Sequence, residues 1–128
     1  MFIYPDIGLM AGRLVTLRKG QLDRPAFHAL APLAAARDFV AEGATCLNVV
    51  DYDAVAREGR SNAALVARII EAVDVPVTVA GGIDTIADLA HWIARGADSV
   101  VIGSAAWADP GLVRAACAAF PFRVLLAV

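Results

Sequence analysis

Residues 80–84 read Ala-Gly-Gly-Ile-Asp, and residues 102–106 read Ile-Gly-Ser-Ala-Ala. Each stretch ends a short apolar run, Val75–Ala80 or Ser99–Ile102, and opens toward a helix-forming segment. Both stretches therefore mark a junction between a strand and a helix. Two such junctions in succession predict a β/α array, in which a parallel sheet carries helices packed on it.

The same succession of strands and helices extends along the rest of the chain. Long apolar runs with little alternation indicate strands that are buried on both faces. A period-two pattern at Arg13–Arg18 predicts a surface ribbon, while residues 21–28 and 54–60 look like loops. We expect Ser61, Asp84 or Thr85, and Asp109 to cap helices. The predicted strands are residues 2–7, 45–50, 75–80, 99–102 and 122–128, and the predicted helices are residues 32–42, 62–73, 85–95 and 110–120.

Composition narrows the class of protein. The 128 residues suffice for one domain, which we expect to span residues 1–128. The net charge of −2 and the absence of a basic block argue against a nucleic-acid partner. The apolar runs fall far short of the roughly 20 residues that span a bilayer, and no secretory signal is visible. Cys46 and Cys117 lack metal-binding spacing, which predicts no metal site and two buried thiols in a cytoplasmic protein.

The glycines at the two junctions have the chemistry of a phosphate site. Glycine lets the backbone approach a ligand closely, and the helix that follows points free N–H groups at an anion. We therefore predict phosphate binding at Gly81, Gly82, Gly103 and Ser104. A Gly-Gly pair alone often makes only a turn, but two such turns on successive strands favour a phosphate between them. Neither junction matches the dinucleotide fingerprint or a Walker loop.

Several segments share one pattern with a known family: residues 3–9, 43–53, 60–62, 73–77, 80–83, 96–98, 101–106 and 109–110. Together these segments resemble the ProFAR isomerases of histidine biosynthesis, whose close relative is the cyclase subunit of imidazole glycerol phosphate synthase. The similarity covers essentially the whole chain and corresponds to the N-terminal half of the family's (βα)8 barrel.

The resemblance implies a fold, a reaction and a set of site residues. The fold would be half of a TIM barrel, with (βα)4 and a fifth strand. The reaction would be an Amadori rearrangement of an aminoaldose to an aminoketose, which needs a general acid and a general base but no cofactor. The substrate would carry a phosphate at each end, with one of them on Gly82, Gly103 and Ser104. Asp51 would face the cavity as a candidate acid or base.

The chain departs from the family pattern at its first strand. The family's Pro-x-Ile-Asp-Leu reads Pro-Asp-Ile-Gly-Leu at residues 5–9, so Gly8 replaces a catalytic aspartate and the reaction should be weakened or lost. The family's second catalytic aspartate falls beyond Val128. Asp6 lies on the same strand face as Gly8 and roughly 6–7 Å deeper. It is either a relocated base buried in the barrel or a structural carboxylate.

Half a barrel leaves two open sheet edges and an apolar face, which predicts a homodimer or higher homo-oligomer. Two-fold symmetry would supply two phosphate sites for one bisphosphate ligand. The same element order also fits an open flavodoxin-like sheet of order 2-1-3-4-5, and the sequence pattern leaves both folds open. Three functions stay open as well: a weakened isomerase, a non-catalytic sugar-phosphate-binding or assembly module, and a piece of a longer isomerase-like chain.

Overall fold

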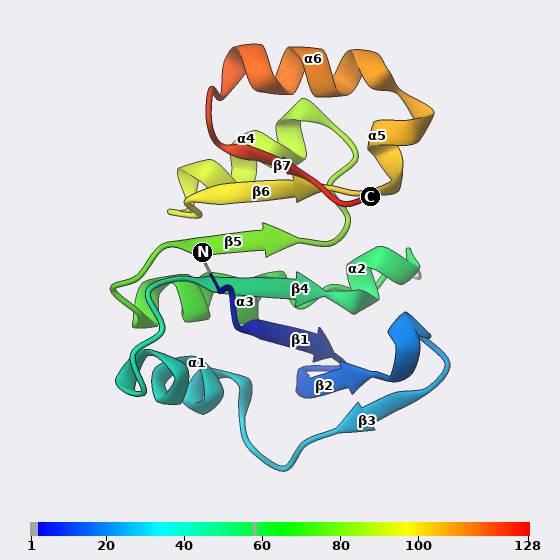
Figure 1. The fold of residues 1–128 in the computed structure, drawn as a ribbon. Helices are drawn as coiled ribbons and strands as arrows, with labels where there is room; N and C mark the ends of the chain where they lie inside the picture. The colour runs from blue at the N-terminus through cyan, green and yellow to red at the C-terminus, as the bar shows by residue number, and fades with distance from the viewer. Residues whose placement is uncertain (1–2, 58) are drawn as a thin grey trace.

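A sheet of seven strands organises the part of the chain that the computed structural model describes, residues 3–57 and 59–128. Five of the strands are parallel and two are antiparallel. In order across the sheet, the strands are β3 (Pro25–Phe27), β2 (Arg13–Leu17), β1 (Asp6–Met10), β4 (Leu47–Asp51), β5 (Val77–Ala80), β6 (Ser99–Ile102) and β7 (Val124–Leu126) (Figure 1).

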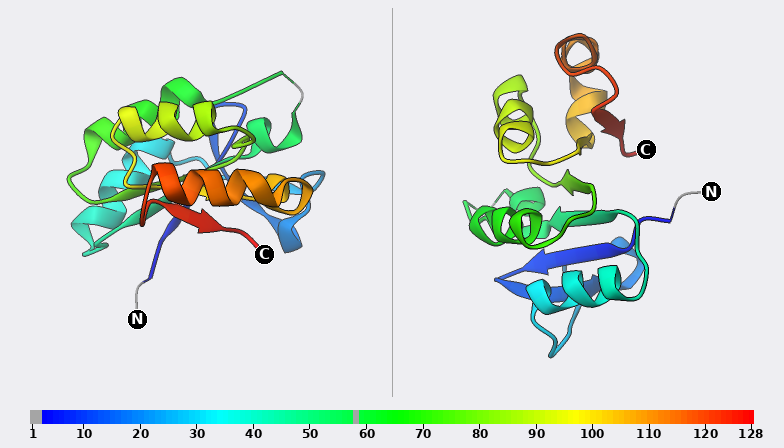
Figure 2. Two further views of the ribbon diagram at one scale, coloured as in Figure 1. Left: turned by 90° about the horizontal axis from the view of Figure 1, so that it is seen from above. Right: turned by 90° about the vertical axis from the view of Figure 1, so that its left-hand side faces the viewer.

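The five parallel strands lie side by side in their order along the chain, β1-β4-β5-β6-β7. Successive β/α units of a barrel have this order, so the predicted half barrel is confirmed and the flavodoxin-like order is not adopted. Four longer helices lie around the outer side of the curved sheet (Figure 2). They are α1 (Pro32–Ala41), α3 (Ala63–Ala72), α4 (Ile86–Ala94) and α6 (Pro110–Ala119).

The hydrophobic core fills the space between the sheet and these helices. Every second strand residue points into it, as the pleat requires, and burying each aliphatic side chain stabilises the fold by roughly 1.5–3 kcal/mol. The other strand residues form the inner, concave face of the sheet. The buried core includes Ile7, Leu9, Leu47, Val49, Val77, Val79, Val100 and Ile102 from the strands, and Ala36, Val66, Ile69, Leu89, Trp92, Leu112 and Ala116 from the helices.

The predicted ribbon forms β2, but the segments on both sides of it differ from expectation. β1 extends from Asp6 to Met10 rather than over residues 2–7, of which residue 2 lies outside the described residues. Antiparallel pairing with β2 holds Gly8 inside the strand, so the tight turn falls at Ala11 and Gly12, whose φ angles are 51° and 72°. Residues 21–28 are not all loop, because β3 pairs with β2.

The hairpin also changes which sheet edges are open. β2 covers the edge of β1, so the two edge strands are β3 and β7. β7 is short, and its Leu125 and Leu126 side chains are 44% and 48% exposed. β7 is therefore an open and apolar sheet edge of the kind that the sequence predicted.

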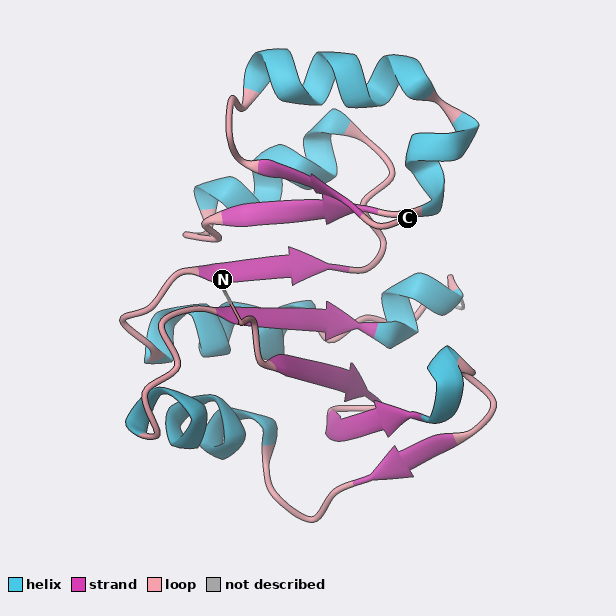
Figure 3. Ribbon diagram, viewed as in Figure 1, coloured by secondary structure: helices cyan, strands magenta, loops and turns pink. Residues whose placement is uncertain are grey.

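Two short helices that no helical pattern predicted follow strands of the sheet (Figure 3). α2 (Tyr52–Ala56) replaces the start of the loop expected at residues 54–60, and α5 (Ser104–Ala108) follows β6. A single turn, η1 (Arg18–Gly20), follows β2. These elements are too short to show a hydrophobic period, and tertiary contacts fix them.

The predicted helix caps are mostly confirmed. Thr85, rather than Asp84, caps α4, in a reciprocal capping box with Asp88. Asp109 caps α6 by accepting hydrogen bonds from two backbone N–H groups of its first turn. α3 begins at Ala63, one residue later than expected, so its N-cap is Asn62 and the prediction of Ser61 as the cap is wrong. Ser61 Oγ still accepts a hydrogen bond from the Ala63 N–H.

The two free cysteines differ in burial. Cys46 is buried as expected, but Cys117 is exposed, because α6 turns Leu112 and Ala116 toward the core and leaves the next position on its outer side. The prediction of two buried thiols is therefore wrong for Cys117. Within the described residues, no helix is long and apolar enough to cross a membrane.

Candidate functional site

A cavity of about 390 Å³ opens at the carboxyl ends of β4, β5 and β6. All four residues predicted to bind phosphate line it, which brings the two glycine turns into one site as the sequence suggested. Ligand sites of α/β sheets commonly lie at this end of the strands. The concave face of the sheet supplies the floor, which consists of Asn48, Val50, Ala80 and Val101.

Close packing requires glycine in the first turn but not in the second. Gly81 has φ +109°, and a Cβ there would overlap the Asp51 carbonyl oxygen. Gly82 has φ +69°, and a Cβ there would lie 2.9 Å from Ala54 Cβ. Close packing against the junction of β4 and α2 thus requires glycine at both positions. At Gly103 a Cβ would meet no atom within 4 Å, so its bare backbone faces open space.

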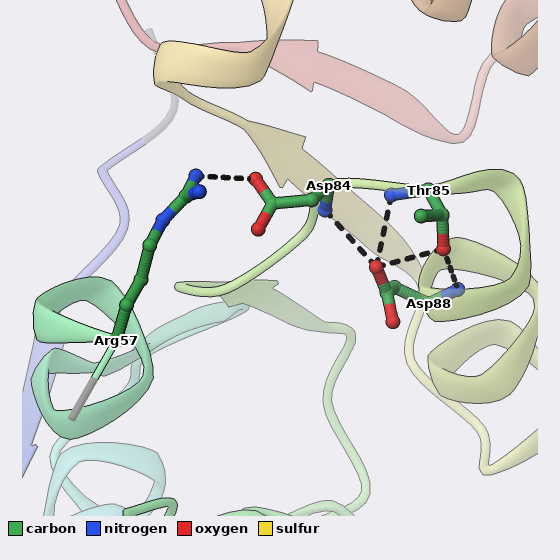
Figure 4. A network of polar contacts seen from close by, with 4 residues as sticks. All are labelled: Arg57, Asp84, Thr85 and Asp88. Carbon is green, nitrogen blue, oxygen red and sulfur yellow. Dashed lines mark hydrogen bonds and ion pairs between the residues drawn. The ribbon is translucent and has the colours of Figure 1, made fainter. Parts of the chain in front are cut away.

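A charged pair lies in the lining of the same cavity. Arg57 Nη2 is 2.7 Å from Asp84 Oδ1, which joins the loop after α2 to the loop after β5 (Figure 4). The Asp84 N–H donates to Asp88 Oδ2 at 3.1 Å, so the capping box of α4 holds the backbone of Asp84. Our sequence reasoning missed Arg57. The sequence feature that could have identified it is a basic residue shortly after β4, at the carboxyl end of the sheet.

The structure does not bring Asp51 into the cavity. Its side chain lies on the same face of β4 as Leu47 and Val49 and is 2% exposed. The carboxylate accepts four hydrogen bonds: from the Ala54 N–H at 3.1 Å, Ser61 Oγ at 3.0 Å, the Asn62 N–H at 2.6 Å and Asn62 Nδ2 at 2.8 Å. The expectation that Asp51 faces the cavity is therefore wrong, because strand alternation turns it toward the helix layer.

Asn62 is a second functional-looking polar residue that proves to be structural, and sequence reasoning missed its role. It is 7% exposed, and its Nδ2 also donates to Asp53 Oδ2 at 2.9 Å. The Asn62 Oδ1 accepts from the Gly12 N–H at 2.8 Å, and Asp53 Oδ2 accepts from the Ala11 N–H at 2.6 Å. This network fixes the β1–β2 turn to the loop before α3.

Asp6 lies on the concave face, as strand alternation predicted. Its Oδ1 accepts a hydrogen bond from Asn48 Nδ2 at 2.7 Å, across the register that pairs the two residues. The Asp6 side chain is exposed rather than buried. Thr78 and Ser99 continue the polar row on β5 and β6, with their hydroxyl oxygens 2.8 Å apart.

Gly8 has no room for a side chain. A Cβ there would lie 2.6 Å from the Val15 carbonyl oxygen and 2.7 Å from Tyr52 Cε2. The Tyr52 ring therefore covers the position where the family pattern has an aspartate. Partial burial raises the pKa of the Tyr52 phenol above 10.0, and the negative charge of Asp6 raises it further. The group beside Gly8 is thus a neutral phenol.

No cluster of three or more His, Cys, Asp or Glu side chains in the described ranges could hold a metal ion.

Comparison with known proteins gives the family. A family model described as "Histidine biosynthesis protein" matches residues 2–128. This chain belongs to the histidine biosynthesis protein family. Its members are TIM barrels, and the sequential parallel strands agree with that fold.

Relatives in the histidine biosynthesis family support the resemblance to ProFAR isomerases. A protein of Acidiphilium cryptum is 42% identical over 126 residues, which cover 98% of this chain and 51% of the relative. One of Paramagnetospirillum magneticum is 38% identical over 128 residues, or 100% and 54%. Both are named 1-(5-phosphoribosyl)-5-((5-phosphoribosylamino)methylideneamino) imidazole-4-carboxamide isomerase. The chain spans about half the length of these curated relatives.

Proposed function

We propose that this chain is a phosphate-binding half barrel derived from an aldose–ketose isomerase, with the isomerase activity weakened or lost. The cavity at the carboxyl ends of β4, β5 and β6 carries the proposal, because it gathers both glycine turns and one arginine. Gly82, Gly103 and Ser104 offer backbone N–H groups and a hydroxyl to an anion. Gly81 shapes the turn. The ligand class is a sugar phosphate, in keeping with the phosphoribosyl groups in the relatives' names.

The first strand is the reason to expect a loss of activity. Glycine cannot transfer a proton, and the Val15 carbonyl and the Tyr52 ring leave no space for a carboxylate at position 8. Asp6 is a carboxylate on the inner face of the sheet that could act as an acid or base. The network around Asp51 leaves that carboxylate without a free lone pair directed at the cavity, so we assign it no proton transfer.

We further propose that two copies associate through the β7 edge. The exposed leucines of β7 and the open parallel edge favour a partner strand, and a two-fold axis would place two phosphate sites in one assembly. Light scattering at several protein concentrations tests this. We expect a dimer in native material, and a monomer at all concentrations would contradict it.

Calorimetric titration tests the binding function. We expect ribose 5-phosphate to bind saturably, while ribose, which lacks the phosphate, gives no heat. Gly103→Val should weaken binding about tenfold or more, because its side chain enters the cavity, which is a loss of about 1.4 kcal/mol. A flat titration with the phosphorylated sugar would contradict the proposal. Turnover is tested separately by growth of an isomerase-deficient strain carrying this chain, where we expect poor growth or none.

A further inference from the structure

Arg57 is the only positively charged side chain among the described residues that line the cavity. Its guanidinium belongs to the residue that ends α2, where a φ of 57° turns the chain out of the helix. The side chain is 60% exposed. A long, flexible and largely solvated cation at a cavity wall can change its partner at little cost in free energy.

The present partner of Arg57 uses little of the guanidinium's capacity. One ion-pair contact, from Nη2 to Asp84 Oδ1, joins the two side chains. A guanidinium has five N–H donors in a planar fork, a geometry suited to bidentate binding of phosphate. Asp84 is 38% exposed, so solvent screens this pair, and exposed pairs contribute little to stability.

Asp84 would work against an anion in the same cavity. Asp84 lines the same cavity as Gly82 and Gly103, and its carboxylate holds the guanidinium that an anion there would need. Because solvent screens the direct repulsion between this partly exposed carboxylate and the anion, Asp84 acts on the anion through Arg57. Arg57 neutralises that carboxylate in the structure described. The capping box of α4 fixes the backbone of Asp84 (Figure 4). The arginine, whose side chain is long and largely exposed, is the partner with more freedom to move.

We propose that Arg57 is the cation that recognises phosphate at this site. Its guanidinium leaves Asp84 and binds a phosphate monoester. Asp84 then acts as a built-in competing anion that limits affinity. This inference rests on the proposed phosphate site and adds to it the residue that recognises the charge. The chemistry requires a dianionic oxygen cluster, so an uncharged sugar gains nothing from Arg57.

Four variants and two controls test the proposal by titration with ribose 5-phosphate. Arg57→Gln should weaken binding about tenfold, the typical scale for one charge-assisted bidentate contact. Asp84→Asn should tighten binding roughly three- to tenfold, because the competing carboxylate is gone. The double variant should bind like Arg57→Gln, because Asp84 acts through the arginine. Arg57→Lys should recover only part of the affinity, because a lysine lacks the planar fork.

The controls remove the same charges elsewhere. Arg68→Gln on the exposed side of α3 and Asp74→Asn in the loop after it change the net charge equally, and each should alter affinity less than twofold. Urea unfolding of each variant separates lost binding from lost folding.

Each result has a distinct meaning. If the unchanged protein binds no ribose 5-phosphate, the proposed function fails and this inference fails with it. If the unchanged protein binds but Arg57→Gln binds equally well, only this inference is overturned. If Asp84→Asn weakens binding, the competition between phosphate and Asp84 is overturned. The same follows if Asp84→Asn tightens binding as much in the Arg57→Gln background as it does in the unchanged protein.

Discussion

Replacing Gly81 by alanine should destabilise the fold by about 2–5 kcal/mol. The φ of +109° costs a residue with a Cβ roughly 1–2 kcal/mol. The new Cβ would also overlap the Asp51 carbonyl oxygen and lie 3.1 Å from the carbonyl carbon. Overpacking of this kind costs about 1–3 kcal/mol more. Because the contacted atoms belong to the backbone, they cannot rotate away as a side chain would.

Gly43→Ala is a matched control for the backbone strain. Gly43 has a φ of +104°, close to that of Gly81, but a Cβ there would have no atom within 4 Å. We expect this variant to lose only about 1–2 kcal/mol. Urea unfolding gives both free energies, provided that the m-value is unchanged. The difference between the variants then measures the contact with the junction of β4 and α2.

Equal losses in the two variants would refute this reasoning. They would show that the conformation alone, and not the close approach to Asp51, requires glycine at position 81. A loss at Gly81 smaller than the loss at Gly43 would contradict the described geometry of the turn. We therefore expect Gly81 to be needed for folding, while the residues beside it bind the ligand.

Three further predictions concern the first strand and the Asp51 network. Asp51→Ala should cost about 2–4 kcal/mol in urea unfolding, because it leaves the four donors to Asp51 without their buried acceptor, whereas the exposed Asp74→Ala should cost less than about 0.5 kcal/mol. Tyr52→Phe should make stability less sensitive to alkaline pH, since the raised pKa of Tyr52 contributes stability that is complete below pH 10.0 and is lost as pH rises through the folded-state pKa; an unchanged pH profile between neutrality and about pH 11 would count against the burial of the phenol. Gly8→Asp should destabilise by about 1–3 kcal/mol and restore no isomerase activity, because the Val15 carbonyl and the Tyr52 ring occupy the space; growth of an isomerase-deficient strain on this variant would contradict that view.

The apolar runs carried most of the fold. Ser99–Ile102 was predicted with its observed bounds, and β4 and β5 were predicted to within two residues at each end. Such runs are readable because burial on both faces demands them. β3 and α2 were not predicted, because three to five residues held by their neighbours carry no period of their own. The bounds of β1 were wrong because β2 pairing extends it past Gly8.

The candidate site was predicted in part. The two glycine turns meet as expected, because parallel strands bring their carboxyl ends to one edge of the sheet. Asp51 was misplaced, although Leu47 and Val49 on the same strand already indicated which face is buried. Arg57 and Tyr52 could not be placed, since a loop conformation and a ring contact decide where they lie.

A titration of backbone amide chemical shifts with ribose 5-phosphate tests the central claim most directly. If this cavity binds phosphate, the amides of Gly82, Gly103 and Ser104 should shift together and reach saturation at one common dissociation constant. Amides of Gly43 and Ala44, in the loop that precedes β4 at the opposite end of the sheet, should not move. Absence of saturable shifts at those three residues, or a response centred elsewhere on the sheet, would contradict the account.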